Sequence, residues 1–463
     1  MVTTTPAGVP ALVIAAPASG SGKTTVATGL IGALRGVGHR VAPFKVGPDF
    51  IDPGYHALAA GRPGRNLDPV LVPEELIAPL YRHGSAGADI AVIEGVMGLF
   101  DGRIDEHAVT PARGSTAHVA QRLGAPVLLV VDVRGQSQSI GAVLQGFSTF
   151  HRGVHIGGVI LNRVGSPRHE QVLRQACEEA GVPVLGAIPR RDELSVPSRH
   201  LGLVTALEHG GQAHAAVAAM TALVAQHVDL AAVVALAGSR VNAERWDPDA
   251  VVGEQMQGRP VVAVAAGKAF SFGYAEHNEL LRAAGAEVVE FDPLTETLPA
   301  HTAALVLPGG FPEQYLAELS ANDQLRGQVR ALATRAPVHA ECGGLAYLMN
   351  DLDGHRMCGV LGGSARFTDR LTLGYRDAVA VADSPLYAAG ERTVGHEFHR
   401  TTVEFTDQCE PAWMLRGGAG GPVPDGAVRA GVHASYLHTH PAAQPRSVAR
   451  FVSRAASFTK LGR

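Results

Sequence analysis

The sequence predicts an α/β protein of two domains, each with a largely parallel sheet, and three observations support this. A glycine-rich loop near the N-terminus joins an apolar run to a helical pattern. Short apolar runs then alternate with helix-length stretches as far as about residue 230, which implies a sheet covered by helices on both faces. A second set of runs starts near residue 259 and contains a Cys-Gly-Gly turn. The length of 463 residues agrees, because a single hydrophobic core does not usually extend over so long a chain.

The glycine-rich loop has the features of a phosphate-binding P-loop. The apolar run Pro10–Ala16 is typical of a strand buried on both faces, and apolar residues recurring from Val26 mark the helix after the loop. Backbone N–H groups of such a loop can surround phosphate oxygens at the helix N-terminus. Lys23 would contact the β- and γ-phosphates and Thr24 would hold Mg²⁺. The predicted nucleotide-binding residues are Ser19, Gly20, Ser21, Gly22, Lys23, Thr24 and Thr25.

The loop departs from the usual P-loop pattern at its entry. Pro17 stands where the pattern has its first glycine, and proline has no N–H to offer to a phosphate. Ala18 provides no second lysine, which argues against the two-lysine partitioning ATPases. The alternative is a Gly/Ser-rich turn with a solvated lysine, but the flanking strand and helix favour the P-loop.

Composition excludes several classes of protein. A formal net charge of −4, from 39 basic and 43 acidic residues, gives no nucleic-acid footprint and no basic membrane patch. Hydrophobic residues make up 46% and charged residues 18%, which suits well-buried domains rather than disorder. The four cysteines form no C-x-x-C pair, and no apolar run reaches the ~18–20 residues that span a bilayer. We therefore expect a cytoplasmic protein without nucleic-acid or membrane partners.

The chain divides at a polar, irregular segment, residues 238–258, which we predict to be a linker between domains 1–237 and 259–463. Further strands of the first domain are expected at Val41–Phe44, Ile90–Ile93, Pro126–Val131, Ile156–Leu161 and Pro183–Ile188. Its helices are expected at Glu74–Arg82, Ala112–Leu123, Ile140–Phe150, Arg168–Ala180 and Gln212–Gln226. The second domain should have strands at Val261–Ala265, Glu287–Phe291, Ala303–Leu307 and Val338–Ala340, then antiparallel strands at Leu371–Tyr375, Val379–Ala382, Thr401–Phe405 and Ala427–His433. Its helices should lie at Glu276–Ala284, Asp323–Thr334, Leu345–Met349 and Arg446–Ala456.

Acidic residues follow two of the expected strands, at the edge where such sheets bind ligands. Glu94 ends an apolar strand with glycine behind it, and Asp49 follows a Gly-Pro turn that can project it towards the phosphates. Asp49, Glu94 and Thr24 are therefore the predicted ligands of Mg²⁺, which prefers oxygen. Asp52 and Asp101 are expected slightly further out, on the substrate side.

Some of these polar residues also have a local explanation. Asp49 and Asp52 can be turn formers and helix caps beside proline. Asn162, at the end of an expected strand, can present a donor and an acceptor to an adenine edge, or it can form an Asx-turn. We include Asn162 among the nucleotide-binding residues.

The turn in the second domain predicts a nucleophilic cysteine. Strand, tight turn and helix follow one another around Cys342, and the glycines after it allow the sulfur to sit at a helix N-terminus. Such a position is expected to lower the pKa of the thiol from its ordinary ~8.5. The backbone N–H groups of Gly343 and Gly310 are the expected oxyanion donors.

A cysteine nucleophile needs a base from elsewhere in the chain. His438 is preferred, His440 is second, and His396 and His399 are competitors. The other three cysteines are expected to be core residues.

In these motifs the chain resembles the cobyrinic/hydrogenobyrinic acid a,c-diamide synthases of cobalamin biosynthesis, over nearly its full length. The stretches that carry the resemblance begin at Ser19, Lys45, Glu94, Arg199, Pro308, Ala340 and Ser435.

The resemblance implies a synthetase domain similar to dethiobiotin synthetase, followed by a class I glutamine amidotransferase domain. It implies a carbon–nitrogen ligase that uses ATP, Mg²⁺ and glutamine to amidate corrin carboxylates through an acyl phosphate. By resemblance, Lys23 and Thr24 bind phosphate and metal, and Cys342 and His438 are nucleophile and base. Asp49 and Glu94 would hold the metal, with Asp52 and Asp101 on the substrate side.

The resemblance leaves alternatives open. Cobalt-free hydrogenobyrinic acid is favoured over cobalt-containing cobyrinic acid as substrate. A cobyric acid synthase type of enzyme and a nucleotide-switched scaffold with an inert amidotransferase half are the other hypotheses, and a homodimer is not excluded. Many class I amidotransferases have a glutamate two residues after the histidine, where this chain has His440, so the residue that orients His438 is undetermined. Arg62, Arg65, Arg103 and Arg199 are candidate partners for substrate carboxylates.

Overall fold

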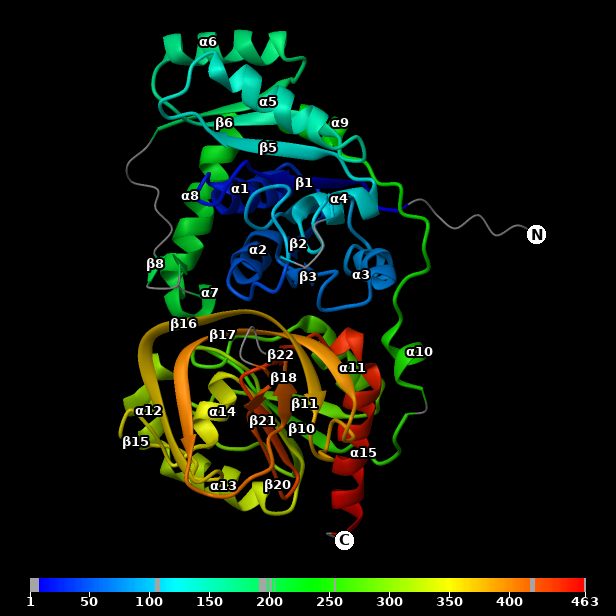
Figure 1. The fold of residues 1–463 in the computed structure, drawn as a ribbon, viewed down its shortest axis with the longest axis vertical. Coiled ribbons are helices and arrows are strands. Elements are labelled where there is room, and N and C mark those ends of the chain that lie inside the picture. The colour runs from blue at the N-terminus through cyan, green and yellow to red at the C-terminus, as the bar shows by residue number, and fades with distance from the viewer. Residues whose placement is uncertain are drawn as a thin grey trace, which may run out of the picture. The chain divides into compact units, whose positions relative to one another are not determined.

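The computed structural model describes residues 8–104, 109–190, 198–199, 202–203, 205–253, 255–416 and 421–461. The chain forms two compact units, Met1–Trp246 and Asp247–Arg463 (Figure 1). The predicted α/β class is confirmed, because each unit contains a parallel sheet with helices beside it. Among the described residues, no helix has the length and apolar character needed to cross a bilayer.

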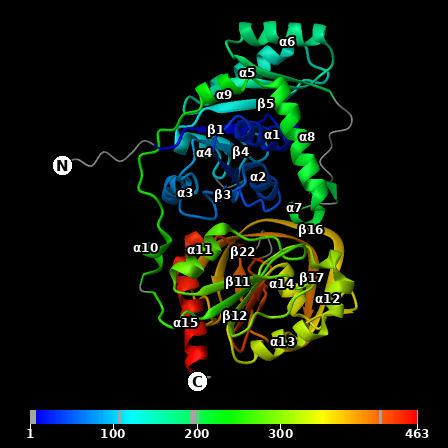
Figure 2. The same ribbon diagram turned by 180° about the vertical axis from the view of Figure 1, so that it is seen from behind.

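The sheet of the first unit has seven strands in the order β3-β2-β4-β1-β5-β6-β7, and all of its pairs are parallel. Helices lie on both sides of it (Figures 1 and 2). Its central strands are almost wholly apolar and buried, as expected of a sheet covered on both faces. The strands are β1 (Ala11–Ala15), β2 (Val41–Val46), β3 (Arg65–Leu67), β4 (Ile90–Glu94), β5 (Val127–Asp132), β6 (Ile156–Val164) and β7 (Val184–Pro189).

The helices of the first unit agree with the predicted alternation. The sequence did not predict β3, α2, α7 or α9, which are short or lie in segments without clear periodicity. The helices are α1 (Lys23–Gly36), α2 (Asp52–Ala60), α3 (Ile77–Gly84), α4 (Thr116–Leu123), α5 (Ser139–Phe150), α6 (Pro167–Glu179), α7 (Ala206–His209), α8 (Gly211–His227) and α9 (Leu230–Leu236).

Helix α1 lies very close to α8. A Cβ at Gly29 would come within 2.4 Å of the carbonyl oxygen of Met220, and one at Gly32 within 2.0 Å of Thr221 Oγ1. Only glycine at these positions allows the approach. This packing fixes the helix whose N-terminus forms the end of the P-loop.

The second unit is built on a sheet in the order β11-β10-β12-β13-β21-β20, parallel except for the β20–β21 pair. Its strands are β10 (Val261–Ala265), β11 (Glu287–Phe291), β12 (Thr302–Leu307), β13 (Val338–Glu341), β20 (Ala427–Arg429) and β21 (Val432–Ser435). Its helices include α11 (Ala275–Ala283), α12 (Leu316–Ala321), α13 (Asp323–Ala333), α14 (Gly343–Leu348) and α15 (Pro445–Leu461).

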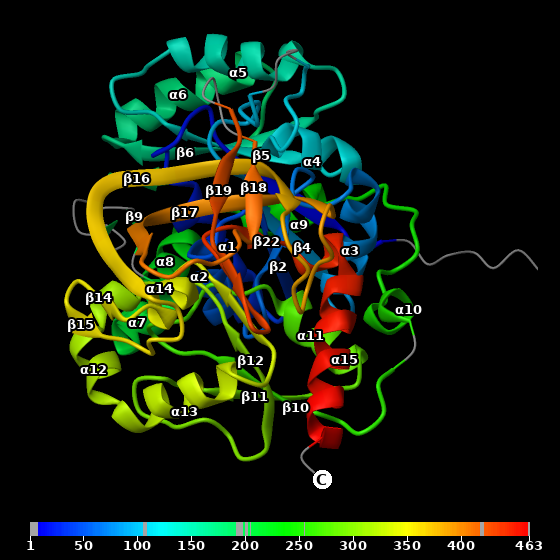
Figure 3. The same cartoon turned by 60° about the horizontal axis from the view of Figure 1, so that its bottom comes forward.

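A second, mainly antiparallel sheet lies after residue 350. The two strands predicted at Leu371–Tyr375 and Val379–Ala382 are in fact one long strand, β16 (Gly363–Ala380), paired with β17 (Arg392–Phe405). Figure 3 shows these two strands curving side by side. Gly374, with φ of 145°, lies inside β16 rather than in a turn between two strands. The sheet is completed by β14 (Asp351–Leu352), β15 (His355–Arg356), β18 (Trp413–Leu415), β19 (Val423–Asp425) and β22 (His438–Thr439).

The segment predicted as a linker is shared between the two units. Gly238 forms a bridge with Ala11 in the first unit, whereas Met256 N donates to Ala284 O in the second. The short helix α10 (Pro248–Val252) lies between these points.

Candidate active sites in the two units

The P-loop lies at the centre of the first sheet, between the end of β1 and the start of α1. Gly20 and Gly22 have φ of 78° and 94°, which glycine adopts without strain, and Gly22 is the N-cap of α1. At the loop entry, directly before Pro17, Ala16 O accepts from Leu99 N at 2.8 Å, which ties the entry to the segment after β4. Lys23 Nζ donates to Met97 O at 2.6 Å in that same segment.

A buried lysine, Lys45 on β2, lies among the acidic residues beside the P-loop. Its Nζ is 2.5 Å from Asp52 Oδ2 and 3.0 Å from Glu94 Oε1, and it donates to Gly95 O at 3.2 Å. Burial alone would lower the pKa of Lys45, but Asp52 and Glu94 outweigh it and raise the pKa. Lys45 is therefore a permanent cation that allows these carboxylates to be buried.

Glu94 has partners on both of its oxygens. Thr24 Oγ1 donates to Oε1 at 2.7 Å, and His56 Nε2 lies 2.7 Å from Oε2. Burial would raise the pKa of Glu94, but Lys45 and His56 hold it well below its ordinary value. For Asp52 the balance is opposite, because burial and the nearby charges of Asp49 and Glu94 raise its pKa well above the ordinary range.

These side chains fit the magnesium ion that the P-loop implies. Among the described residues no three His, Cys, Asp or Glu side chains are arranged as a metal site, since Lys45 stands between the carboxylates. Thr24 Oγ1 nevertheless lies within hydrogen-bond distance of Glu94 and 3.4 Å from Asp52 Oδ2. A hydroxyl and two carboxylates are hard oxygen donors of the kind that Mg²⁺ takes beside phosphates.

The structure changes the expected order of the acids around this site. Asp52 is buried beside Glu94 and is not further out, because it opens α2 directly beside Lys45. Asp49 is a turn former, as the alternative proposed: its Oδ1 accepts from Ile51 N and Asp52 N, while Oδ2 lies 4.0 Å from Lys45 Nζ. Asp101 is exposed and accepts from Gly98 N at 3.0 Å, so it keeps its outer position.

Asn162 contacts the P-loop backbone itself. Its Nδ2 donates to Ser21 O at 2.9 Å, and a Cβ at Gly22 would lie only 2.3 Å from that nitrogen. Asn162 therefore supports the loop, which neither the adenine-edge nor the Asx-turn interpretation had anticipated. Of the candidate arginines, Arg62 donates to Gly84 O at 2.7 Å, and the side chain of Arg199 lies outside the described residues.

In the second unit, Cys342 occupies a sharp turn between β13 and α14. Its φ is 49°, a conformation that costs energy in a residue with a side chain and that recurs at functional turns. The chain after Cys342 passes so close to the end of β12 that position 344 requires glycine, since a Cβ at Gly344 would lie 2.1 Å from Leu307 O. Cys342 N donates to Ser435 O at 2.7 Å, which ties the turn to the end of β21. The predicted elbow is therefore present.

The expectation of a lowered thiol pKa is wrong for this structure. Burial raises the pKa of Cys342 well above its ordinary value, and the charges of Glu313 and Glu341 add to this. Hydrogen bonds from the backbone N–H groups of Gly343 and Gly310 to the sulfur oppose the rise only in part. The helix N-terminus cannot compensate for desolvation, so the thiol is protonated at rest and needs a base.

The ring of His438 lies against the glycine loop beside Cys342. A Cβ at Gly309 would come within 2.4 Å of its Cε1 and 3.2 Å of its Nε2. On its other side, His438 Nδ1 is 3.4 Å from Glu341 Oε2. The sequence analysis did not single out Glu341, although it directly precedes Cys342.

The structure gives each of the competing histidines a different environment. His396 pairs with His438 across β17 and β22, and burial lowers its pKa to about 3. His399 Nδ1 contacts Thr401 O at 2.8 Å and its ring stacks on Tyr436 at 3.8 Å. His440 Nδ1 accepts from Ala442 N at 3.3 Å. Of these histidines, His438 lies against the loop of Gly309 and Gly310.

Three residues of the two sites were missed: Lys45, His56 and Glu341. Lys45 and Glu341 each carried a weak signal: a charged residue directly after an expected buried strand requires a partner if the strand extends over it. No sequence pattern identifies His56, because α2 was not predicted.

Comparisons with known proteins agree with these two sites. Residues 12–204 match a family model described as the CobQ/CobB/MinD/ParA nucleotide binding domain, and residues 261–445 match the CobB/CobQ-like glutamine amidotransferase domain. A protein of Mycobacterium bovis named hydrogenobyrinate a,c-diamide synthase is 70% identical over 97% of this chain and 99% of its own. A Streptomyces coelicolor protein of the same name is 54% identical over 96% of this chain and 97% of its own. The cobyrinate a,c-diamide synthase of a Synechococcus species is 38% identical over 98% of this chain and its full length.

Identity at this level over the whole chain, together with a nucleotide-binding domain and a glutamine amidotransferase domain in the same order, shows that the chain belongs to the a,c-diamide synthase family.

Proposed function

We propose that this chain is an ATP- and glutamine-dependent ligase that amidates the a and c side-chain carboxylates of hydrogenobyrinic acid. The observation that carries the proposal is the presence of two separate sites. One has a P-loop with buried carboxylates, and the other has a cysteine elbow beside a histidine. Hydrogenobyrinate synthases of Mycobacterium bovis and Rhodobacter capsulatus are 70% and 44% identical to this chain, whereas cobyrinate synthases of Synechococcus and Gloeobacter violaceus are 38% and 40% identical. These identities favour the cobalt-free substrate.

In the first site the protein would activate a carboxylate. A carboxylate is a poor acyl donor, but transfer of the γ-phosphoryl group of ATP to its oxygen gives an acyl phosphate with a good leaving group. Lys23 and the loop N–H groups would hold the phosphates, and Asn162 keeps the loop in shape. Asp101, which is exposed and accepts from Gly98 N, would contact the substrate.

Mg²⁺ would be held by Thr24, Glu94 and Asp52. Asp49 lies nearby, since its Oδ2 is 4.0 Å from Lys45 Nζ. The ion would neutralise charge on the phosphate oxygens. Lys45 contributes a second fixed positive charge at the same place.

In the second site glutamine would be hydrolysed. His438 takes the proton of the Cys342 thiol, the sulfur attacks the amide carbon of glutamine, and His438 returns the proton to the departing ammonia. Water then cleaves the thioester to glutamate and regenerates the thiol. The N–H groups of Gly343 and Gly310, which point at the sulfur, would hold the developing oxyanion. The ammonia attacks the acyl phosphate and displaces phosphate, which leaves the amide.

We further propose the domain limits 1–237 and 259–463, with residues 238–258 as a linker. A cytoplasmic location fits the four cysteines, all of which are free. A homodimer is a further proposal, which the mass of the protein in solution tests.

The experiment is a product-mass assay. The purified protein is incubated with ATP, Mg²⁺, glutamine and either hydrogenobyrinic acid, cobyrinic acid or a corrin that already carries the a,c-diamide. The proposal expects two successive amidations of hydrogenobyrinic acid. Preferential use of the a,c-diamide would show a cobyric acid synthase type of enzyme, and no product with any corrin would overturn the proposal.

A further inference from the structure

Glu341, the last residue of β13, lies in direct contact with the proposed base. Its Oε2 is 3.4 Å from His438 Nδ1. Its Oε1 is 3.4 Å from His339 Nε2 and accepts from Thr439 N at 3.3 Å and from Thr439 Oγ1 at 3.2 Å. His339 and Glu341 are two residues apart on one strand, so their side chains share a face of the sheet. The carboxylate is thus held on one oxygen and faces the imidazole of His438 with the other.

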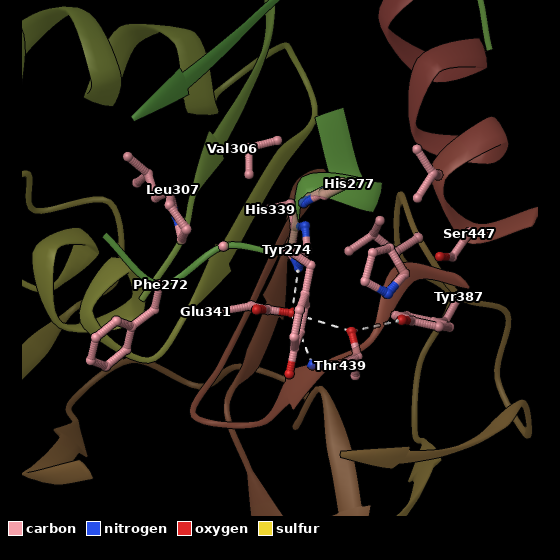
Figure 4. Close-up of a pocket in the computed structure, with 15 residues that line it drawn as sticks. Phe272, Tyr274, His277, Val306, Leu307, His339, Glu341, Tyr387, Thr439 and Ser447 are labelled. Atoms are coloured by element: carbon pink, nitrogen blue, oxygen red, sulfur yellow. Dashed lines mark hydrogen bonds and ion pairs between the residues drawn. The ribbon is translucent and has the colours of Figure 1, made fainter. Parts of the chain in front are cut away.

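Glu341 borders a cavity of about 30 Å³, large enough for one or two water molecules. Figure 4 shows the contacts that join Glu341 to His339 and Thr439, and Thr439 to Tyr387, along its wall. His277 also lines the cavity. Electrostatic interactions between a charge and its neighbours are strong in such a buried place, because little water screens them.

Glu341 is charged in spite of its burial. Burial would raise the pKa of its carboxyl, but hydrogen bonding to His339 and His438 holds the pKa well below its ordinary value. Two further histidines nearby are neutral, since burial lowers the pKa of His277 to about 4 and that of His433 to about 3. The imidazoles in direct contact with the carboxylate are those of His339 and His438.

Many class I amidotransferases have a glutamate two residues after the histidine base, but this chain has His440 there, in a different role. His440, two residues after His438, accepts from Ala442 N and packs on the ring of Tyr274, with ring centroids 4.4 Å apart. Its Nδ1 caps a short helical turn, and a histidine offers no carboxylate to His438.

We propose that Glu341 is the positioning residue of His438, and that His339 and Thr439 fix Glu341 through its other oxygen. The base would then be oriented by the residue that precedes the nucleophile in the chain. With Nδ1 of His438 donating to Glu341, Nε2, on the side of Gly309, carries no proton and can accept one from Cys342. This inference rests on the proposed glutamine hydrolysis at Cys342, but not on the identity of the amidated substrate.

The main test compares Glu341→Gln with Glu341→Ala and Glu341→Asp. Thr439 N and Oγ1 donate towards Oε1, so the amide introduced by Glu341→Gln should place its oxygen there and turn its NH₂ group to His438. Because that NH₂ group donates to Nδ1 of His438, it would favour the tautomer with its proton on Nε2. In this tautomer Nε2 cannot accept the proton of Cys342. We therefore expect Glu341→Gln to lower kcat for glutamate release about 10²–10⁴-fold with a much smaller change in KM. Glu341→Ala imposes no tautomer and should be at least as active as Glu341→Gln, and Glu341→Asp should recover part of the wild-type activity.

Two controls are available in the same region. His433→Gln removes a buried histidine that does not contact Glu341, and His440→Asn keeps a side chain able to cap the helical turn; both should retain kcat within a few-fold. His339→Gln should lower kcat less than Glu341→Gln does. Denaturant unfolding followed by the fluorescence of Trp413, which is buried in the second unit, should show a folded second unit in every variant. Synthesis with high ammonia in place of glutamine should also persist, because the P-loop site is intact.

A Glu341→Gln variant that keeps the wild-type kcat, or that is clearly more active than Glu341→Ala, would overturn the inference, because a residue that only fills space tolerates the isosteric change better. The same ranking is measured by the rate at which 6-diazo-5-oxo-L-norleucine, a reactive glutamine analogue, labels Cys342, followed by intact mass. This readout needs no corrin, so a wrong corrin assignment and a wrong role for Glu341 give different results.

Discussion

Each of the two sites buries a charged side chain, but the chemical groups that surround this side chain differ between the two sites. In the first unit the buried charge is the Lys45 ammonium, held by the carboxylates of Asp52 and Glu94. In the second it is the Glu341 carboxylate, held by the imidazoles of His339 and His438. The Lys45 ammonium and the Glu94 carboxylate keep their charges near neutral pH, whereas an imidazole readily gains or loses a proton. The first site is therefore suited to holding charged phosphates, and the second to moving a proton.

Lys23 and Cys342, the reactive groups of the two sites, also differ in how neighbouring charges affect them. Burial and the nearby charge of Lys45 lower the pKa of Lys23, and Glu94, Asp52 and Asp101 oppose this only in part. Burial raises the pKa of Cys342, and the nearby carboxylates raise it further. Carboxylates thus favour the charged form of the lysine and disfavour that of the thiol, which therefore depends on a base.

The largest expected effect separates the two sites completely. Cys342→Ala removes the sulfur, so glutamine-dependent product formation should fall on the order of 10⁴-fold or more. Synthesis from high ammonia should continue, because the P-loop site is intact. Initial rates with each nitrogen donor measure this, and loss of both activities would contradict the idea of separate sites.

The second effect concerns the buried lysine. Lys45→Met leaves Asp52 and Glu94 buried without their cation, and should reduce the free energy of unfolding of the first unit by about 3–5 kcal/mol. Denaturant unfolding followed by the fluorescence of Trp246, in a Trp413→Phe background, measures it. The double variant with Asp52→Asn should recover part of the loss. A change below about 1 kcal/mol would mean that the carboxylates find other partners.

A reciprocal change at the P-loop should leave the cysteine site working. Lys23→Ala should lower synthesis with either nitrogen donor about 10²–10³-fold, because a positive charge on the phosphates is lost. Labelling of Cys342 by the glutamine analogue should be unaffected. Slower labelling in this variant would show that the two sites depend on each other.

The smallest effect tests the buried histidines of the second unit. Burial lowers the pKa of His433 to about 3, whereas an unfolded histidine titrates near 6.5. Between these values the unfolded state binds more protons, so stability is full above about pH 6.5 and is lost as the pH falls towards 3. At pH 5 this cost is about 2 kcal/mol.

His433→Gln cannot titrate, so its loss of unfolding free energy between pH 7 and pH 5 should be smaller by about 2 kcal/mol. Denaturant unfolding at both pH values measures the difference in the second unit. An equal acid loss in the variant and the wild type would show that His433 is not buried in its neutral form.

Features that depend on residues adjacent in the chain could be predicted from the sequence. The P-loop, the alternation of strands and helices, and the turn at Cys342 each depend on local patterns: apolar runs, glycines and a Lys-Thr pair. The sequence alone also placed Glu94 and Cys342 at strand ends, because the pattern of buried strands shows where each one stops.

The partners of these residues were decided by tertiary structure. Lys45, Asp52 and His56 surround Glu94 because β2, β4 and α2 meet beside the P-loop, and no local pattern records that meeting. Glu341 faces His438 because β13 and β22 bring residues almost a hundred positions apart into contact. The pKa of Cys342 depends on burial, which is a property of the packed unit. The sequence by itself therefore determined which elements form and which side chains at their ends are candidates for chemistry. Only the fold decided the charges and the neighbours of these side chains, since both depend on distance in space.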